Sequence, residues 1–130
     1  MSESRHLTTY VDRPADEVYA YAADPSHLPE WAAGLSGSIE QRDGRWIAAS
    51  PMGEVEVRFA PANPFGVLDH EVVLPEGTAV TNPMRVLPDG AGSEVVFTLR
   101  RRDGMSDAEL ESDTAAVRTD LARLKEVMER

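Results

Sequence analysis

Near the N-terminus the spacing of hydrophobic residues changes from every second position to every third or fourth. Residues 6–11 alternate between polar and apolar side chains, which predicts a β-strand. Pro14 then suits the first turn of a helix that carries an apolar stripe. Asp24 is suited to cap a second helix, which begins at Pro25 and is expected to end near Gly34. This part of the chain therefore predicts one strand followed by two short helices.

The middle of the chain is a series of short alternating segments separated by Gly, Pro and Asp. The predicted strands cover residues 38–41, 45–50, 54–60, 67–74, 78–87 and 94–102. The separators include Asp43-Gly44 and Pro75-Glu76-Gly77, which are typical of tight turns. Such short connections place consecutive strands side by side and antiparallel. With the first strand, the pattern predicts an antiparallel sheet of about seven strands.

The C-terminal quarter predicts one long helix. Ser106 and Glu109 have the spacing of a capping box at its start. Apolar or small residues then recur at intervals of four and three, at Leu110, Thr114, Val117, Leu121, Leu124 and Met128. A sheet with one apolar face must be covered on that face, and this helix is the only predicted element long enough to cover it. The sequence therefore predicts an α+β protein in which the C-terminal helix packs on the sheet.

Several short segments resemble a known superfamily. They are residues 13–19 (RPADEVY), 24–31 (DPSHLPEW), 65–70, 82–86 and 104–107. With the order of elements, they resemble the helix-grip fold of the START-like superfamily, also called SRPBCC, and its polyketide cyclase/dehydrase-like bacterial proteins. The resemblance implies a curved sheet wrapped around the long C-terminal helix, with a cavity between them that usually holds a hydrophobic small molecule. The superfamily includes lipid carriers, cyclases and co-chaperones, so the fold alone does not assign a chemistry.

Length and composition narrow the possibilities. The 130 residues suit a single domain over residues 1–130, and 42% hydrophobic residues suffice for one core. The net charge of −10 repels phosphate backbones, so we expect no nucleic-acid partner. The chain has no apolar run of membrane-spanning length and no signal-peptide pattern, and it has no cysteine, so we expect a cytoplasmic protein. The sequence leaves open whether it is a monomer or a homodimer.

The segment FGVLDHEVVLP, residues 65–75, places three titratable residues inside an apolar run. Successive side chains of a strand point to opposite faces. One face would carry His70, and the other would carry Asp69 and Glu71. Burying one imidazole is less unfavourable than burying two carboxylates. We therefore expect His70 to point inward together with Leu68, Val72 and Leu74.

Pairing across the turn at residues 75–77 gives His70 a neighbour. Symmetric pairing places His70 opposite Asn82 and Leu68 opposite Met84. The inward-facing side chains of the second strand are then apolar, with one asparagine among them. This agrees with the assignment of His70 to the inward face. The same alternation sends Val55, Val57, Phe59, Val95, Phe97 and Leu99 to the inward face.

These considerations give a set of candidate ligand-binding residues. They are Trp31, Trp46, Val57, Phe59, His70, Asn82, Met84, Phe97, Leu99, Val117 and Leu121. Three roles are open for His70. It is a core histidine bonded to Asn82 or to a backbone carbonyl, a polar group that orients a ligand, or a general acid or base.

No pattern indicates a metal site, a phosphate-binding loop or a nucleophile elbow, so we expect no cofactor. Three functions remain: binding of a hydrophobic or aromatic small molecule, lipid- or polyketide-like; polyketide cyclisation or dehydration with His70 as acid or base; and a protein-interaction or co-chaperone-like role. An open pocket containing His70 would favour the first two. A collapsed core in which Phe59, Phe97 and Val117 touch would favour the third.

Overall fold

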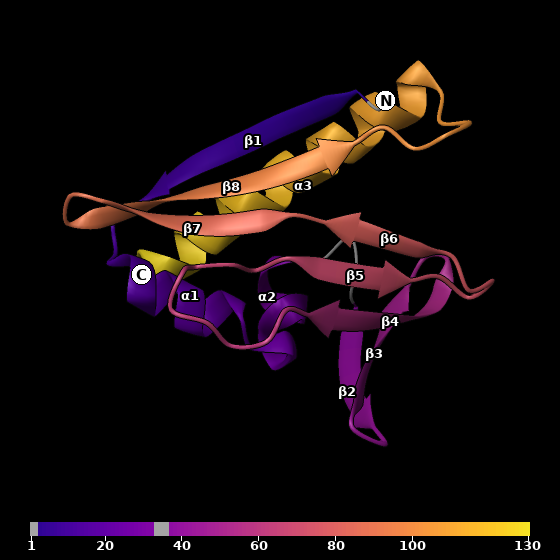
Figure 1. Ribbon diagram of the computed structural model, residues 1–130, viewed down its shortest axis with the longest axis horizontal. Coiled ribbons are helices and arrows are strands. Elements are labelled where there is room, and N and C mark those ends of the chain that lie inside the picture. Colours follow the sequence, from indigo (N-terminus) through magenta and orange to yellow (C-terminus); the bar gives the residue numbers. More distant parts are fainter. Residues whose placement is uncertain (1–2, 33–36) are drawn as a thin grey trace.

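The computed structural model describes residues 3–32 and 37–130 of the chain (Figure 1). The strands within these residues are β1 (Ser4–Val11), β2 (Ser38–Arg42), β3 (Arg45–Ser50), β4 (Gly53–Phe59), β5 (His70–Val73), β6 (Ala79–Asn82), β7 (Met84–Asp89) and β8 (Gly92–Arg100). The helices are α1 (Ala15–Ala22), the 3-10 helix η1 (Pro25–His27), α2 (Leu28–Trp31) and α3 (Asp107–Met128). The expected end of the second helix near Gly34 lies outside the described residues.

All strand pairs are antiparallel, in the orders β2-β3-β4-β5-β6 and β1-β8-β7. The long helix α3 runs behind β1 and β8, while α1 and α2 lie at one end of the sheets (Figure 1). This arrangement confirms the predicted helix-grip architecture of an antiparallel sheet around a long C-terminal helix. No helix within residues 3–32 and 37–130 has the length and apolar character needed to cross a membrane.

Pro83 divides one predicted strand in two. The segment 78–87 forms β6 and β7 on either side of Pro83, because a proline nitrogen has no hydrogen to donate to a sheet. The two sheets remain joined there. Thr98 N donates to Pro83 O at 2.9 Å, and Leu68 N donates to Met84 O at 2.9 Å. Residues 3–32 and 37–130 therefore contain eight strands where the sequence predicts about seven, and these strands form one curved surface.

The register predicted around residues 75–77 is confirmed. His70 lies opposite Asn82, and Val72 lies opposite Val80. Leu68, His70 and Val72 are buried. Asp69 turns the other way, where its Oδ1 accepts hydrogen bonds from Met84 N and from the Arg85 guanidinium. Strand parity thus separates the titratable residues of this segment as expected.

Helix α3 begins and packs as its sequence predicts. The Ser106 hydroxyl accepts from Glu109 N at 3.1 Å, and the Glu109 carboxylate accepts from Ser106 N at 3.1 Å, so the capping box is formed. The buried side of the helix carries Leu110, Thr114, Leu121 and Leu124. Near its C-terminal half, Arg123 Nε donates to Glu30 O at 3.1 Å and ties α3 to α2.

Candidate functional site

A small chamber lies between the curved sheet, α2 and α3. Its volume is about 120 Å³. Its walls come from α2 and the residue after it, from β5, β6 and β8, and from the middle of α3. The lining residues are Leu28, Trp31, Ala32, His70, Val72, Asn82, Phe97, Val117, Asp120 and Leu121. Most of these side chains are apolar, and His70, Asn82 and Asp120 are the polar ones.

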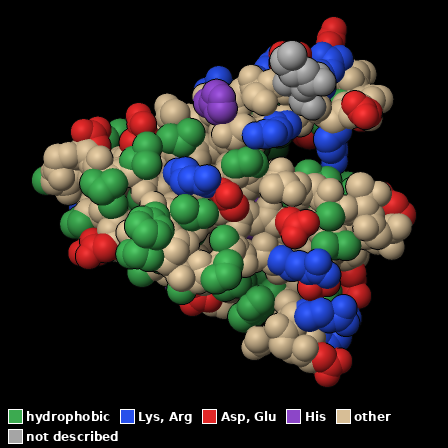
Figure 2. Space-filling model, in the orientation of Figure 1, with side chains coloured by type: hydrophobic (Ala, Val, Ile, Leu, Met, Phe, Trp, Pro, Cys, Tyr) green, Lys and Arg blue, Asp and Glu red, His purple; other side chains and the backbone are tan. Residues whose placement is uncertain are grey.

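The chamber continues into a larger groove of about 840 Å³. Both spaces are lined by Val72, Asn82, Phe97, Val117 and Asp120. The rim of the groove is formed by Glu76 and residues 78–81 on one side, and by Arg100 and residues 102–105 on the other. The space-filling view shows a notch between these two parts of the molecule (Figure 2). The chamber is therefore the inner end of a space that opens to solvent.

His70 projects from β5 into the chamber and is only 6% exposed. Its Nδ1 lies 3.0 Å from Leu68 O. Burial lowers the pKa of His70, and the Leu68 carbonyl and Asp69 oppose this effect. Since a carbonyl oxygen can only accept, the neutral ring carries its proton on Nδ1 and leaves Nε2 as an acceptor. Of the two intramolecular partners considered for His70, the structure shows the backbone carbonyl rather than Asn82.

Aromatic rings hold the imidazole from two sides. The ring centroid of Phe59 lies 5.1 Å from that of His70, and the Phe97 ring lies 6.0 Å away in an edge-on orientation. Phe59 is directly opposite His70 in the β4–β5 ladder. These contacts limit rotation of His70, so its ring presents a defined edge to the chamber.

Asp120 is a site residue that the sequence analysis did not find. It lies on α3 one turn after Val117, at the boundary between the chamber and the groove. Burial raises the pKa of Asp120 to about 7, and the nearby Arg123 acts weakly in the opposite direction. Within the described residues its carboxylate forms no ion pair or hydrogen bond. The available signal was its position three residues after Val117, next to Leu121, within the apolar stripe.

Trp31 closes the other side of the chamber. It lies at the end of α2 and is 3% exposed. Its indole Nε1 is buried, and it has no hydrogen-bond partner among the described residues. A buried donor without a partner is unfavourable.

The structure separates the other candidate residues into two groups. Trp31, His70, Asn82, Phe97, Val117 and Leu121 line the chamber, and Leu99 lines only the groove. Trp46, Val57, Phe59 and Met84 line neither space. Trp46 and Val57 face each other on β3 and β4, where Val57 is buried in the core and Trp46 is half-buried. Met84 is 1% exposed on β7, which α1 covers, and Phe59 lies behind His70.

A family model described as "Polyketide cyclase / dehydrase and lipid transport" matches residues 4–129. The chain belongs to this family. The match spans every strand and helix that surrounds the chamber, and the resemblance to the SRPBCC superfamily is therefore confirmed. The family has a small-molecule-binding fold. Membership therefore supports a ligand-binding or polyketide-cyclase role for this protein. No match was found among curated proteins.

Several solved structures have the same fold as this chain. XoxI from Bacillus cereus superimposes with a TM-score of 0.75 at 14% identity, covering 96% of this chain and 94% of that one. DynU16, a putative protein in the dynemicin biosynthetic locus, gives 0.72 at 16% identity, with 97% of this chain and 47% of that one covered. The di-domain ARO/CYC BexL from the BE-7585A biosynthetic pathway gives 0.67 at 21% identity, with 95% and 45% covered. At these identities the similarities show that this family member shares the fold of these proteins.

Proposed function

We propose that this protein binds a hydrophobic small molecule, aromatic or polyketide-like, in the space between the sheet and α3. One observation carries the proposal: an apolar chamber that contains a few polar side chains is continuous with a groove open to solvent. Binding pockets for small molecules are mostly apolar, with a small number of polar groups that orient the ligand. At about 840 Å³, the groove lies within the range of roughly 300–1,000 Å³ usual for such pockets.

The apolar and the polar residues of the chamber would have different roles in binding. Phe97, Val117 and Leu121 supply apolar contact area on the sheet side and the helix side of the chamber. His70 and Asn82 lie opposite each other on β5 and β6 and would orient one polar group of the ligand. The open chamber favours binding or catalysis over the protein-interaction alternative, because the rings of that region leave a space beside His70.

The first test is native mass spectrometry of freshly purified protein, in which we expect a mass increment from a co-purified small molecule. The neutral fluorescent probe N-phenyl-1-naphthylamine provides a second measurement. Val117→Trp fills the boundary between chamber and groove, and we expect it to weaken probe binding by about tenfold or more, which corresponds to about 1.4 kcal/mol. Ala115→Trp, on the exposed side of the same helix, is the matched control and should bind like the wild type. Absence of both a co-purified molecule and probe binding would show that the proposal is wrong.

A polyketide cyclase or dehydratase is the second candidate. The observation that favours it is the presence of two titratable side chains, His70 and Asp120, in one partly desolvated chamber. Burial pushes the pKa of the histidine down and that of the aspartate up to about 7, and groups that titrate near neutral pH are suited to proton transfer. If His70→Asn abolished turnover of an aromatic polyketide surrogate and left its affinity unchanged, catalysis would replace simple binding as the assigned function.

A further inference from the structure

The polar atoms around the inner chamber are mainly hydrogen-bond acceptors. His70 offers Nε2, because its Nδ1–H is directed to Leu68 O at 3.0 Å. Asp120 offers carboxylate oxygens that no described residue occupies. Asn82 contributes an amide, which can both accept and donate. A ligand group that satisfies these atoms must therefore carry a proton that it can donate.

Among these residues, Asp120 most needs a hydrogen-bond donor from the ligand. A carboxylate in apolar surroundings is unfavourable unless it is paired or hydrogen-bonded. Arg123 is the one cation that acts on it detectably, and the Arg123 Nε atom donates to Glu30 O instead of to this carboxylate. The direction of the pKa shift is consistent with a carboxyl group that lacks a partner in the free protein. A hydrogen bond from a bound ligand would supply the missing interaction.

The size of the chamber limits what can reach Asp120. Apolar cavities of roughly 150 Å³ accept a benzene ring. The inner chamber, at about 120 Å³, is somewhat smaller but opens into the groove, so it has room for at most one ring or a short branched end, while the groove holds the remainder of a longer molecule. Phe97 and Trp31 provide aromatic surfaces against which a flat ring can pack.

The charge of the inserted group follows from the same residues. A ligand carboxylate would meet the Asp120 carboxylate and a neutral imidazole, in a protein with a net charge of −10. An ammonium group would need partners for three donor hydrogens in a chamber with mostly apolar walls, and would lose its hydration on entry. A hydroxyl group has one proton to donate, and its oxygen can accept from a donor such as the Asn82 amide.

We propose that the end of the ligand held in the inner chamber is an uncharged ring that carries a hydroxyl group, which donates a hydrogen bond to Asp120. This inference rests on the proposed binding function and specifies the chemical class of the ligand. His70 Nε2 is the second acceptor, available to an adjacent hydroxyl on the same ring. The chamber thus selects phenol-like ends over carboxylate-ended molecules such as fatty acids.

Three probes of nearly the same shape test the inference by isothermal titration calorimetry of the full chain at pH 8, where most of the Asp120 carboxyl groups are ionised. They are 2-naphthol, 2-methoxynaphthalene, in which a methyl group replaces the donor proton, and 2-naphthoate, which carries the excluded charge. We expect the naphthol to bind about tenfold tighter than the methoxy compound, as for a hydrogen bond to a charged group. The naphthoate should bind most weakly of the three.

Variants of Asp120 test whether this residue causes the preference for 2-naphthol over 2-methoxynaphthalene. Asp120→Leu removes the acceptor and should make 2-naphthol and 2-methoxynaphthalene bind equally, while Asp120→Asn retains one acceptor oxygen and should keep part of the difference. Glu126→Gln removes a charge from the exposed side of the same helix and should leave the preference unchanged. An unaltered preference in Asp120→Leu would overturn the inference, and so would equal binding of the two neutral probes by the wild type.

The outcomes separate this inference from the proposed function. If the naphthalene probes and N-phenyl-1-naphthylamine all fail to bind, the binding function itself is wrong. If 2-naphthol and 2-methoxynaphthalene bind equally well, only the inference about the hydroxyl group is wrong. Tighter binding of 2-naphthylmethylamine than of 2-naphthol would also overturn it, because the chamber would then select a cation.

Discussion

Gly66 is the residue that allows the segment before β5 to approach β7. Its φ of +72° lies in the left-handed region, and a Cβ at this position would lie 2.1 Å from Val86 O. Val86 N donates to Gly66 O at 2.9 Å, and two residues later Leu68 N donates to Met84 O at 2.9 Å. The same crossing fixes the position of Leu68, whose carbonyl holds the His70 ring. A backbone constraint near residue 66 thus bears directly on the chamber.

We expect Gly66→Ala to destabilise the protein by about 2–3 kcal/mol, because the substitution adds both an unfavourable φ and a backbone clash. Gly44→Ala is the matched control. Gly44 also has a positive φ, +78°, but a Cβ there would meet no atom within 4 Å, so only about 1 kcal/mol should be lost. Urea denaturation of both variants measures the difference. Equal losses would show that the contact with Val86 does not matter.

At the scale of single residues, the sequence predicts which way a side chain points from a strand better than it predicts the surroundings of a side chain on a helix. The period of two and the turn at residues 75–77 determine that His70 points inward and lies opposite Asn82, and both hold in the structure. Asp120 could not be recognised in this way. An acidic residue on a helix is ordinarily solvated, and its burial depends on where α3 crosses the open end of the sheet. That crossing is set by tertiary packing and is absent from the local pattern.

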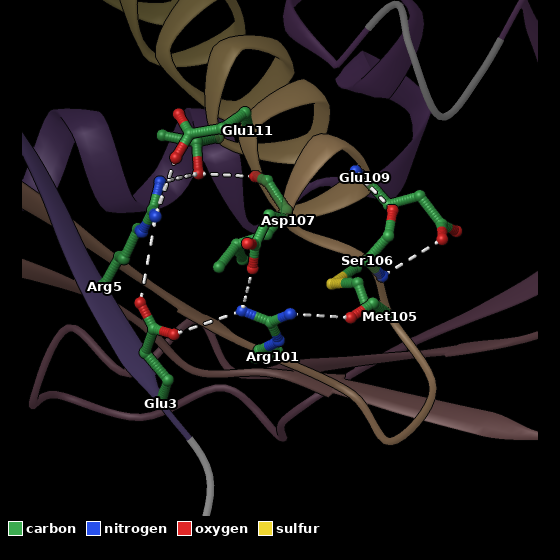
Figure 3. Close-up of polar contacts among 10 residues, drawn as sticks. Glu3, Arg5, Arg101, Met105, Ser106, Asp107, Glu109 and Glu111 are labelled. Carbon is green, nitrogen blue, oxygen red and sulfur yellow. Dashed lines mark hydrogen bonds and ion pairs between the residues drawn. The ribbon is translucent and has the colours of Figure 1, made fainter.

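At the scale of elements, an ionic cluster joins β1, the segment after β8 and the start of α3 (Figure 3). Arg101 contacts Asp107 at 2.7 Å and Glu3 at 3.5 Å, and it donates to Met105 O at 3.0 Å. Arg5 contacts Glu111 at 2.8 Å. The cluster therefore holds the segment after β8, in which residues 102–105 line one side of the groove, against α3 and β1.

Replacing Arg101, the central residue of this cluster, should make the segment at the rim of the groove more mobile. We expect Arg101→Ala to release N-phenyl-1-naphthylamine faster than the wild type in stopped-flow measurements, with a small decrease in Tm. The ion pairs are partly exposed, so about 1 M salt, which shortens the Debye length to ~3 Å, should bring the wild type towards the variant. Arg58→Ala, which removes an exposed ion pair with Glu56 on β4, should release the probe at the wild-type rate. The same release rate in all three proteins would mean that the cluster has no part in ligand exit.

The alternation of strands also explains why only some inward residues reach the chamber. Trp46, Val57 and Met84 lie outside its lining although each lies on a strand, as the sequence predicts. The sheet is curved, and α1 covers β7 while α2 and the middle of α3 leave space over β5 and β6. Periodicity identifies the inward face of a strand, whereas the division of that face into core and cavity depends on how the helices sit on it.

At the scale of the whole molecule, two chamber residues make stability depend on pH in opposite directions. Burial lowers the pKa of His70 from 6.5, so the unfolded chain takes up a proton first and stability falls as the pH drops below about 6.5. Burial raises the pKa of Asp120 from 3.8 to about 7, so the folded protein keeps a proton that the unfolded chain has already released. The contribution of Asp120 to stability therefore falls as the pH rises from about 4 to about 7, and stays at its lowest above that range.

Replacing Asp120 should remove this loss. The pKa difference corresponds to at most about 4 kcal/mol, and partial contact with solvent through the groove reduces it to roughly 1–2 kcal/mol. We expect Asp120→Asn to be more stable than the wild type by that amount at pH 8, and to differ little from it at pH 4. His70 is present in both proteins, so its own titration cancels in the comparison. Denaturant unfolding at the two pH values measures the gap, with Glu126→Gln as the control for loss of a negative charge on α3. A gap of equal size at pH 4 and pH 8 would show that the Asp120 carboxylate is not destabilised by the chamber, and a ligand would then have no unpaired acceptor to satisfy there.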